Sequence, residues 1–221
     1  MSDQAAIIGA TTWGTTLGIL LAQNKVPVTL LARTEAEAQT LSSQRRNARF
    51  LPDSTFPDRL TVTSEPESAL HQSDLVIITV PSDRLRENVR RIKAHLQTGT
   101  IVLSATKGLE LPTAQRMSQV LEDELPAELH SGICVLSGPN LAKEIVEGKP
   151  ASTVIAGHNP NAAQQAQNTL MSASFRIYTS NDVLGVELAG ALKNIVALGA
   201  GIGDGMVAGE NAKAAFITRG L

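Results

Sequence analysis

Short apolar runs that alternate with helix-like segments restrict this chain to a narrow set of folds. Eight such runs, rich in Val and Ile, cover residues 5–9, 26–32, 60–63, 74–80, 100–106, 132–138, 151–157 and 175–179. Most are apolar on both alternating faces, as strands covered by helices on both sides must be. Residues 13–24, 35–45, 83–96 and 113–125 show apolar side chains at helical spacing. The alternation predicts an α/β fold with a mostly parallel, doubly wound sheet, whose ligands bind at the carboxyl ends of the strands.

The strand signal ends near Asn181, and the sequence beyond it is helical in character. Residues 182–205 predict one long helix, and residues 209–221 predict the start of another. We therefore predict a sheet domain over residues 1–181 and the beginning of an all-helical C-terminal domain over residues 182–221. A helical segment of about 40 residues cannot bury its own apolar surface well, so we interpret this second part as truncated. The apolar surface that it exposes favours a homodimer or aggregation.

The composition is that of a soluble globular protein. The chain has 221 residues, of which 43% are hydrophobic and 18% charged, and its formal net charge is −2. This balance, with only 3% aromatic residues, argues against a nucleic-acid partner. No basic segment precedes the first apolar run, and no uninterrupted apolar stretch reaches about 18 residues, so we expect neither a signal peptide nor a membrane span. The single cysteine, Cys134, is expected to be a buried packing residue. We expect a cytoplasmic protein.

The turn after the first apolar run has the spacing of a dinucleotide-binding fingerprint, G-x-G-x-x-G. Gly9 and Gly14 occupy its outer positions, but Thr11 stands where the middle glycine belongs. An apolar run precedes Gly9 and a predicted helix follows Gly14, which is the context of a Rossmann-like site. The start of that helix would offer free N–H groups to a pyrophosphate. The other interpretation is an ordinary α/β turn with small residues.

The residue after the second predicted strand bears on the choice of cofactor. An acidic side chain there suits the ribose hydroxyls of NAD, whereas a basic side chain suits the 2′-phosphate of NADP. Arg33 occupies this place, and its planar fork of donors matches a phosphate. We therefore expect NADP, or NADP and NAD both, as the cofactor. A solvated surface arginine is the alternative.

One lysine interrupts a long apolar helical segment. Residues 188–203 hold one charged side chain, Lys193, and one other polar side chain, Asn194. Lysine is almost never buried without a partner, and a desolvated ammonium group has a lowered pKa that suits proton transfer. We therefore expect Lys193 to be desolvated and to do acid–base chemistry. The alternatives are that it reaches water along its aliphatic stem or pairs with a carboxylate.

Two further groups of residues stand at the ends of predicted strands. Lys107 ends the run at 100–106 and precedes Gly108, where a ligand-binding side chain is expected. Gly138 and Asn140, in the "SGPN" stretch after the next run, could bring a backbone N–H and an amide to a polar ligand. Taken singly, each could be only a turn. The four histidines show no paired spacing of metal ligands, so we assign no metal.

With these positions marked, the chain resembles the N-terminal two thirds of the NAD(P)-dependent glycerol-3-phosphate dehydrogenase family. The stretches that carry the resemblance are "GATTWGTTLG", "NARFLP", "VIITVPS", "SATKGLE", "SGPNLAKEI", "ELAGALKNIVALGAGIGDG" and "NAKAAFITRGL". The resemblance implies that dihydroxyacetone phosphate and sn-glycerol 3-phosphate are interconverted by hydride transfer with NAD(P)H, which supplies glycerol phosphate for phospholipid synthesis. A small phosphate is the implied substrate.

The family's site residues match particular positions of this sequence. By the resemblance, Lys193 is the general acid/base with Asn194 beside it, and Lys107 is a second active-site lysine that helps to hold the substrate and borders the cofactor. Gly138 and Asn140 match substrate contacts. The implied cofactor contacts are Gly9, Thr11, Thr12, Trp13, Gly14, Arg33, Phe50 and Ala142.

Two departures from the family pattern affect these expectations. Thr11 replaces a glycine that family members usually keep, which reduces the expected cofactor affinity. The family also continues for about a hundred residues by resemblance, and that part carries an aspartate near the catalytic lysine and an Arg-Asn pair for the substrate phosphate. We therefore expect a chain that ends at Leu221 to bind cofactor but to turn over poorly.

Two other functions remain open on the sequence. One is a non-catalytic dinucleotide-binding module, and the other is a related two-domain dehydrogenase that acts on a hydroxy acid or sugar acid. An Arg-Asn pair after position 221 in the native gene would favour the enzyme over the non-catalytic module. A screen with NADPH and several carbonyl substrates would distinguish the enzyme from the hydroxy-acid or sugar-acid dehydrogenase.

Overall fold

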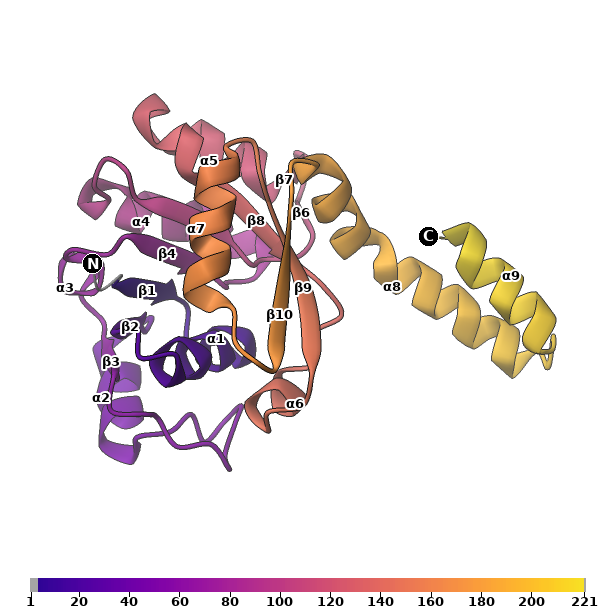
Figure 1. Cartoon of the computed structure of the whole chain (residues 1–221), viewed down its shortest axis with the longest axis horizontal. Helices are drawn as coiled ribbons and strands as arrows, with labels where there is room; N and C mark the ends of the chain where they lie inside the picture. The colour runs from indigo at the N-terminus through magenta and orange to yellow at the C-terminus, as the bar shows by residue number, and fades with distance from the viewer. Residues whose placement is uncertain (1–3, 221) are drawn as a thin grey trace.

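The computed structural model describes residues 4–220, and its centre is an eight-stranded sheet in the order β10-β9-β8-β5-β4-β1-β2-β3 (Figure 1). The strands are β1 Ala5–Ile8, β2 Val28–Leu31, β3 Leu60–Thr63, β4 Leu75–Ile78, β5 Ile101–Ser104, β8 Ile133–Ser137, β9 Ala151–Gly157 and β10 Phe175–Ser180. Each of the eight apolar runs contains one strand. Within this sheet only the β8–β9 pairing is antiparallel, so β9 and β10 run against the other six strands. The predicted fold class, a Rossmann-like and mostly parallel sheet, is confirmed.

Helices cover both faces of this sheet, as the doubly apolar strands require. Residues of α1 Thr12–Gln23, α2 Glu35–Gln44, α6 Ala142–Val146 and α7 Pro160–Leu170 share one core with Ile7 of β1. Residues of α3 Pro66–Leu70, α4 Leu85–Ile92 and α5 Met117–Glu124 share the other with Ile8. Three 3-10 segments, Ser82–Arg84, Lys93–His95 and Ala127–Gly132, adjoin α4 and α5 or lead into β8. Successive side chains of one strand thus enter opposite cores.

The strand order changes direction beside β1. The chain builds β2 and β3 on one side of β1 and then returns to place β4 on its other side. In open α/β sheets, ligands bind at such a switch point, outside the carboxyl ends of the strands. The residues after β1, β4 and β5 are therefore those to examine.

The last two helices form an arm that leaves the sheet. Figure 1 shows α8 Val183–Gly205 running outward from β10 and α9 Glu210–Gly220 folding back along it. Only the first part of α8 packs on the sheet, and Gly190 is its last buried residue. Further along it, apolar side chains are exposed, among them Leu192, Ile195, Leu198 and Ile202. By length and composition alone α8 could cross a membrane, with a mean hydropathy of 1.5, so the expected lack of a membrane span stays a prediction.

A small hairpin follows β5 and was not expected from the sequence. Its strands are β6 Leu109–Glu110 and β7 Gln115–Arg116, which pair antiparallel. Because residues 115–116 belong to this hairpin, the helix predicted over 113–125 begins only at Met117. The predictions also missed α3, α6 and α7. The first two have five residues each, and α7 packs mainly through alanines, which give little periodic signal.

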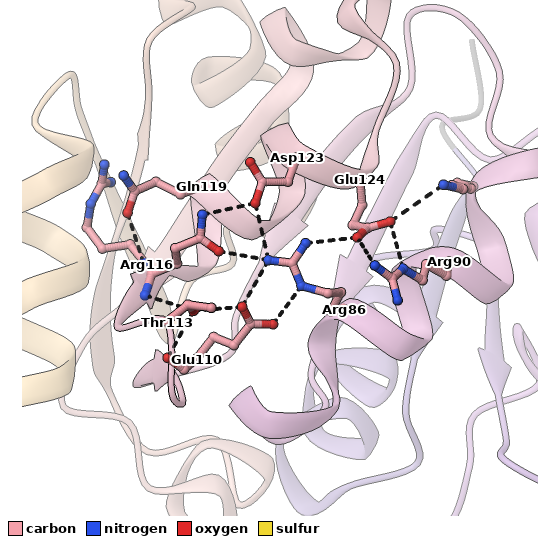
Figure 2. A network of polar contacts seen from close by, with 10 residues as sticks. Arg86, Arg90, Glu110, Thr113, Arg116, Gln119, Asp123 and Glu124 are labelled. Carbon is pink, nitrogen blue, oxygen red and sulfur yellow. Dashed lines mark hydrogen bonds and ion pairs between the residues drawn. The ribbon is translucent and has the colours of Figure 1, made fainter.

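Arginine–carboxylate pairs hold the hairpin against α4 and α5 (Figure 2). Arg86 forms two hydrogen bonds with Glu110, at 2.8 and 2.9 Å, and one with Glu124 at 2.8 Å. Arg90 adds two more to Glu124, at 2.9 and 2.7 Å. The hydrogen bonds from Arg90, and then those from Arg86, lower the pKa of Glu124 from 4.5 to about 2.

We predict that Glu124→Gln lowers the unfolding free energy at neutral pH by roughly 1–3 kcal/mol, since both arginines lose a charged partner. The folded pKa of Glu124 is depressed, so its stabilisation is present above pH 4.5 and is lost as the pH falls toward about 2. The difference between Glu124→Gln and wild type should therefore shrink over this window. Urea denaturation across the pH range measures it. Glu122→Gln, at an exposed neighbouring carboxylate, is the control and should change little. An unfolding difference that does not vary with pH would contradict the assignment.

Candidate active site

The turn between β1 and α1 requires glycine at two positions. Gly9 has φ +105°, and a Cβ built on it would lie 2.9 Å from Cγ1 of Val80. A Cβ on Gly14 would overlap the carbonyl oxygen of Gly9 and the hydroxyl of Thr79. These two glycines therefore let α1 begin directly against the ends of β1 and β4.

Thr11, at the middle position, adopts backbone angles that any residue can take, with φ −76° and ψ 173°. It is the N-cap of α1, because its Oγ1 accepts a hydrogen bond from the N–H of Gly14 at 3.0 Å. The same hydroxyl donates to the carbonyl of Thr79 at 3.1 Å. The threonine that departs from the fingerprint thus ties the start of the helix to the end of β4.

Two buried polar residues that the sequence analysis did not single out support the turn. The hydroxyl of Thr79 lies 3.0 Å from the carbonyl oxygens of both Ile8 and Gly9. Asn47 donates through Nδ2 to the carbonyl of Ala10 at 3.0 Å and to the hydroxyl of Thr15 at 2.9 Å. A polar residue inside or beside an apolar stretch was the available signal, but its partners lie too far along the chain to be identified from the sequence.

A cleft of about 370 Å³ opens in front of this turn, at the switch point of the sheet. Six predicted site residues line it, namely Thr11, Thr12, Trp13, Lys107, Asn140 and Ala142. Residues that follow β4 and β5 complete the wall: Thr79, Val80, Pro81, Ala105 and Thr106. The structure therefore brings together residues that are far apart in the chain, such as Thr11 and Ala142.

Unpaired polar groups in the cleft are suited to a polar ligand. The indole Nε1 of Trp13 and the amide Oδ1 of Asn140 are buried and have no hydrogen-bond partner in residues 4–220. The N–H groups of Thr12 and Trp13, at the positive end of α1, likewise find no acceptor in the described part of the chain. Donors at a helix N-terminus fit the phosphates of a dinucleotide.

Four of the predicted cofactor residues do not line this cleft: Gly9 and Gly14, which form the turn, and Arg33 and Phe50. Arg33 follows β2, and its exposed guanidinium makes no hydrogen bond or ion pair within residues 4–220. Phe50 is half-buried in the loop after α2 and lies under the guanidinium of Arg49, 4.9 Å from the ring centroid. Their roles remain predictions.

Lys107 extends from the end of β5 toward the end of β8. Its Nζ donates to the carbonyl of Gly138 at 2.8 Å. Burial, and then the nearby ammonium of Lys193, lower the pKa of Lys107 to about 8. A Cβ on Gly138 would lie 2.7 Å from Oγ1 and 2.9 Å from Cα of Thr153, so glycine is needed for this close approach between β8 and β9.

The expectation that Lys193 is desolvated is wrong. Lys193 is exposed, as is Asn194 beside it, because α8 leaves the sheet just after its last buried residue, Gly190. Lys193 nevertheless lies near enough to Lys107 to lower the pKa of that lysine. The desolvated lysine of the pair is Lys107, and the helix contributes the solvated one.

Glu187 was not expected at the site. Its carboxylate accepts from Nη1 of Arg116 at 2.6 Å, and from the N–H and hydroxyl of Ser118 at 2.8 and 2.6 Å. Its side chain is 7% exposed. One acidic residue in an apolar helix, six positions before Lys193, was the signal available.

Cysteine and metal chemistry gain no support from the described residues. Cys134 is buried, as predicted, and burial raises the pKa of its thiol to about 12, so the thiol stays protonated near neutral pH. Within residues 4–220 no group of three His, Cys, Asp or Glu side chains is arranged to hold a metal ion.

The glycine turn, the switch-point cleft and the parallel sheet define a dinucleotide-binding α/β protein. Family models narrow this class: the NAD-dependent glycerol-3-phosphate dehydrogenase N-terminus matches residues 4–163, and the C-terminus of the same family matches residues 182–221. The chain belongs to this family.

Individual relatives agree with the family models. A Dehalococcoides mccartyi protein named glycerol-3-phosphate dehydrogenase NAD(P)+ is 52% identical over 220 residues, which are 99% of this chain and 61% of that protein. One of the same name from Chlorobium limicola is 42% identical over 98% of this chain and 65% of its own length. The crystal structure of glycerol-3-phosphate dehydrogenase from Coxiella burnetii is similar with a TM-score of 0.87 and 33% identity, over 99% of this chain and 66% of that one. The chain thus spans somewhat less than two thirds of these relatives.

We predict that Thr11→Val lowers the unfolding free energy by about 0.5–2 kcal/mol, because valine keeps the branched shape but loses the helix cap and the bond to Thr79. Thr12→Val is the matched control. No hydrogen bond from the Thr12 hydroxyl is present within residues 4–220, so its loss should stay within about 0.5 kcal/mol. Chemical denaturation without added ligand compares the two. Equal losses in both variants would show that the Thr11 hydroxyl does not cap α1.

Proposed function

We propose that this chain supplies the cofactor site and the two active-site lysines of a glycerol-3-phosphate dehydrogenase. The reaction would interconvert dihydroxyacetone phosphate and sn-glycerol 3-phosphate by hydride transfer with NAD(P)H. The observation that carries the proposal is that Lys107, which lines the cleft beside the glycine turn, is partly desolvated and lies near the ammonium of Lys193. Membership of the family and the names of the relatives support it.

In this proposal the dinucleotide binds across the switch point. The N–H groups of Thr12 and Trp13 face its pyrophosphate at the start of α1, while Trp13, Asn140 and Ala142 line the cleft around it. Arg33, at the end of β2, is the candidate for the ribose or its 2′-phosphate. When bound, NAD(P)H supplies the hydride, and the protein orients and polarises the carbonyl substrate.

The two lysines would divide the remaining chemistry. Reduction at C2 leaves charge on the carbonyl oxygen, and an ammonium group beside that oxygen stabilises the charge and can donate a proton. We propose Lys193 as the general acid/base, with Asn194 beside it. Lys107, with its pKa lowered to about 8 and its Nζ held by Gly138, would contact the substrate along with Asn140.

The wider setting is also a proposal. Residues 1–181 would form the dinucleotide-binding domain, and residues 182–221 would begin the helical substrate domain. The product would enter phospholipid synthesis in the cytoplasm. The exposed apolar side chains of α8 support the prediction of a homodimer.

Cofactor binding can be followed through Trp13, because it is the only tryptophan and it lines the cleft. We predict that NADPH and NADH quench its fluorescence. Arg33→Asp should weaken NADPH binding by about 10- to 100-fold, the value of one charge-assisted phosphate contact, and should spare NADH. Arg176→Asp, on the far edge strand β10, is the control. Equal loss for both cofactors would remove Arg33 from the proposed role, and no quenching by either would contradict the cofactor site.

We predict that Lys193→Met lowers kcat for reduction of dihydroxyacetone phosphate by about 10²- to 10⁴-fold, the usual contribution of a general acid. The assay follows NADPH oxidation in the full product of the native gene, because the matched relatives are longer than this chain. NADPH affinity should stay unchanged. Preference for a keto acid would favour the hydroxy-acid dehydrogenase, and cofactor binding with no turnover on any carbonyl would favour the non-catalytic module.

A further inference from the structure

The β6–β7 hairpin follows Lys107 in the chain and contacts the helix that carries Lys193. Lys107 and Gly108 directly precede Leu109, the first residue of β6. Arg116, the last residue of β7, reaches Glu187 of α8, the helix that carries Lys193. One structural unit of eight residues, 109–116, therefore contacts both of the segments from which the lysines project.

The hairpin itself is held from the side of α4. Arg86 binds both carboxylate oxygens of Glu110 on β6 and also donates to Oε1 of Gln115 on β7 at 2.8 Å. The Arg86 and Glu110 side chains are 22% and 12% exposed. Figure 2 shows Arg86 at the centre of this network, between Glu110 and Glu124. A bidentate, largely buried ion pair fixes the relative position of its two side chains more tightly than a surface ion pair does. The hairpin is therefore a rigid support for the contact with α8.

Glu187 fastens α8 to that base. Three donors, from Arg116 and Ser118, surround its carboxylate at 2.6 to 2.8 Å. The same carboxylate lines a small cavity with Lys107 and Gly190. A Cβ on Gly190 would overlap the hydroxyl of Ser137, so the helix sits against β8 at this point. Beyond it the helix is exposed, and Glu187 is the last ionic anchor before Lys193 among the described residues.

We propose that Glu187 is a positioning residue: through Arg116 it locks α8 to the hairpin and so sets where Lys193 stands relative to Lys107. The inference rests on the proposed function, in which both lysines act on one substrate. Two ammonium groups at short range repel each other, and α8 packs on β8 and β9 only as far as Gly190, before it reaches Lys193. Without the lock, Lys193 should move away from Lys107 toward solvent.

The pKa of Lys107 reports this separation. The charged group that acts on Lys107 is Lys193 of α8, and Glu187 of α8 lines the same small cavity as Lys107, while β8 and the loop after it present the uncharged Ser137 and Gly138. If Lys193 withdraws, the pKa of Lys107 rises from about 8, though burial still holds it below 10.5. Removing the negative charge of Glu187 would by itself lower that pKa. The two explanations therefore predict opposite signs.

The experiment uses Glu187→Gln and Arg116→Gln in the full product of the native gene. Trace acylation across a range of pH, read by mass spectrometry of the peptide that holds Lys107, gives the pKa of this lysine without any need for turnover. We expect the pKa to rise in both variants and kcat to fall by about 10- to 100-fold, as a misplaced catalytic group would cause. The KM for NADPH should stay at the wild-type value.

Arg90→Gln is the matched control, because Arg90 binds Glu124 in the same network but touches neither the hairpin nor α8. It should leave the Lys107 pKa and kcat at wild-type values. A lower Lys107 pKa in Glu187→Gln, or a wild-type pKa in both test variants, would overturn the inference. Absence of turnover in the wild type would instead count against the proposed function, and the acylation measurement would still decide the role of Glu187.

Discussion

The close approach of Gly14 to the carbonyl of Gly9 is the constraint on which the site depends. No side chain fits between them, so α1 begins directly at the junction of β1 and β4. This placement aims the unpaired N–H groups of the helix at the switch point, where the strand order reverses. Thr11 then performs a task that glycine could not, because its hydroxyl caps the helix and binds Thr79 on β4. Compared with the glycine of the fingerprint, Thr11 has less backbone freedom, but its side chain fixes the start of α1.

The two lysines come from different parts of the fold. Lys107 belongs to the sheet, where parallel strands end at one edge and the carbonyl of Gly138 holds its Nζ. Lys193 belongs to a helix that touches the sheet only near its start. Their relative position therefore depends on whatever joins the sheet to the helix. The β6–β7 hairpin does so with ion pairs, whose strength depends on burial.

The sequence predicted the sheet well because its signal is local. Most strands of the sheet are apolar on both faces and β10 alternates, so β1 to β5 and β8 to β10 could be located from short windows. The glycine turn was equally local. By contrast, Asn47, Thr79 and Glu187 act through partners 32 to 71 positions away, and no window contains both ends of such a contact. The hairpin was missed because two-residue strands carry no periodicity.

The prediction that Lys193 is desolvated failed for a physical reason. An apolar surround in the sequence predicts burial only if the helix packs along its whole length, and α8 packs along its first two turns. Lys193 is exposed in the described chain, so the proton-transfer role proposed for it would not depend on a dry pocket there. It would depend on the placement of Lys193 beside the more desolvated Lys107, which lines the cleft. For this site, the anchor that fixes the helix matters more than the polarity of the helix itself.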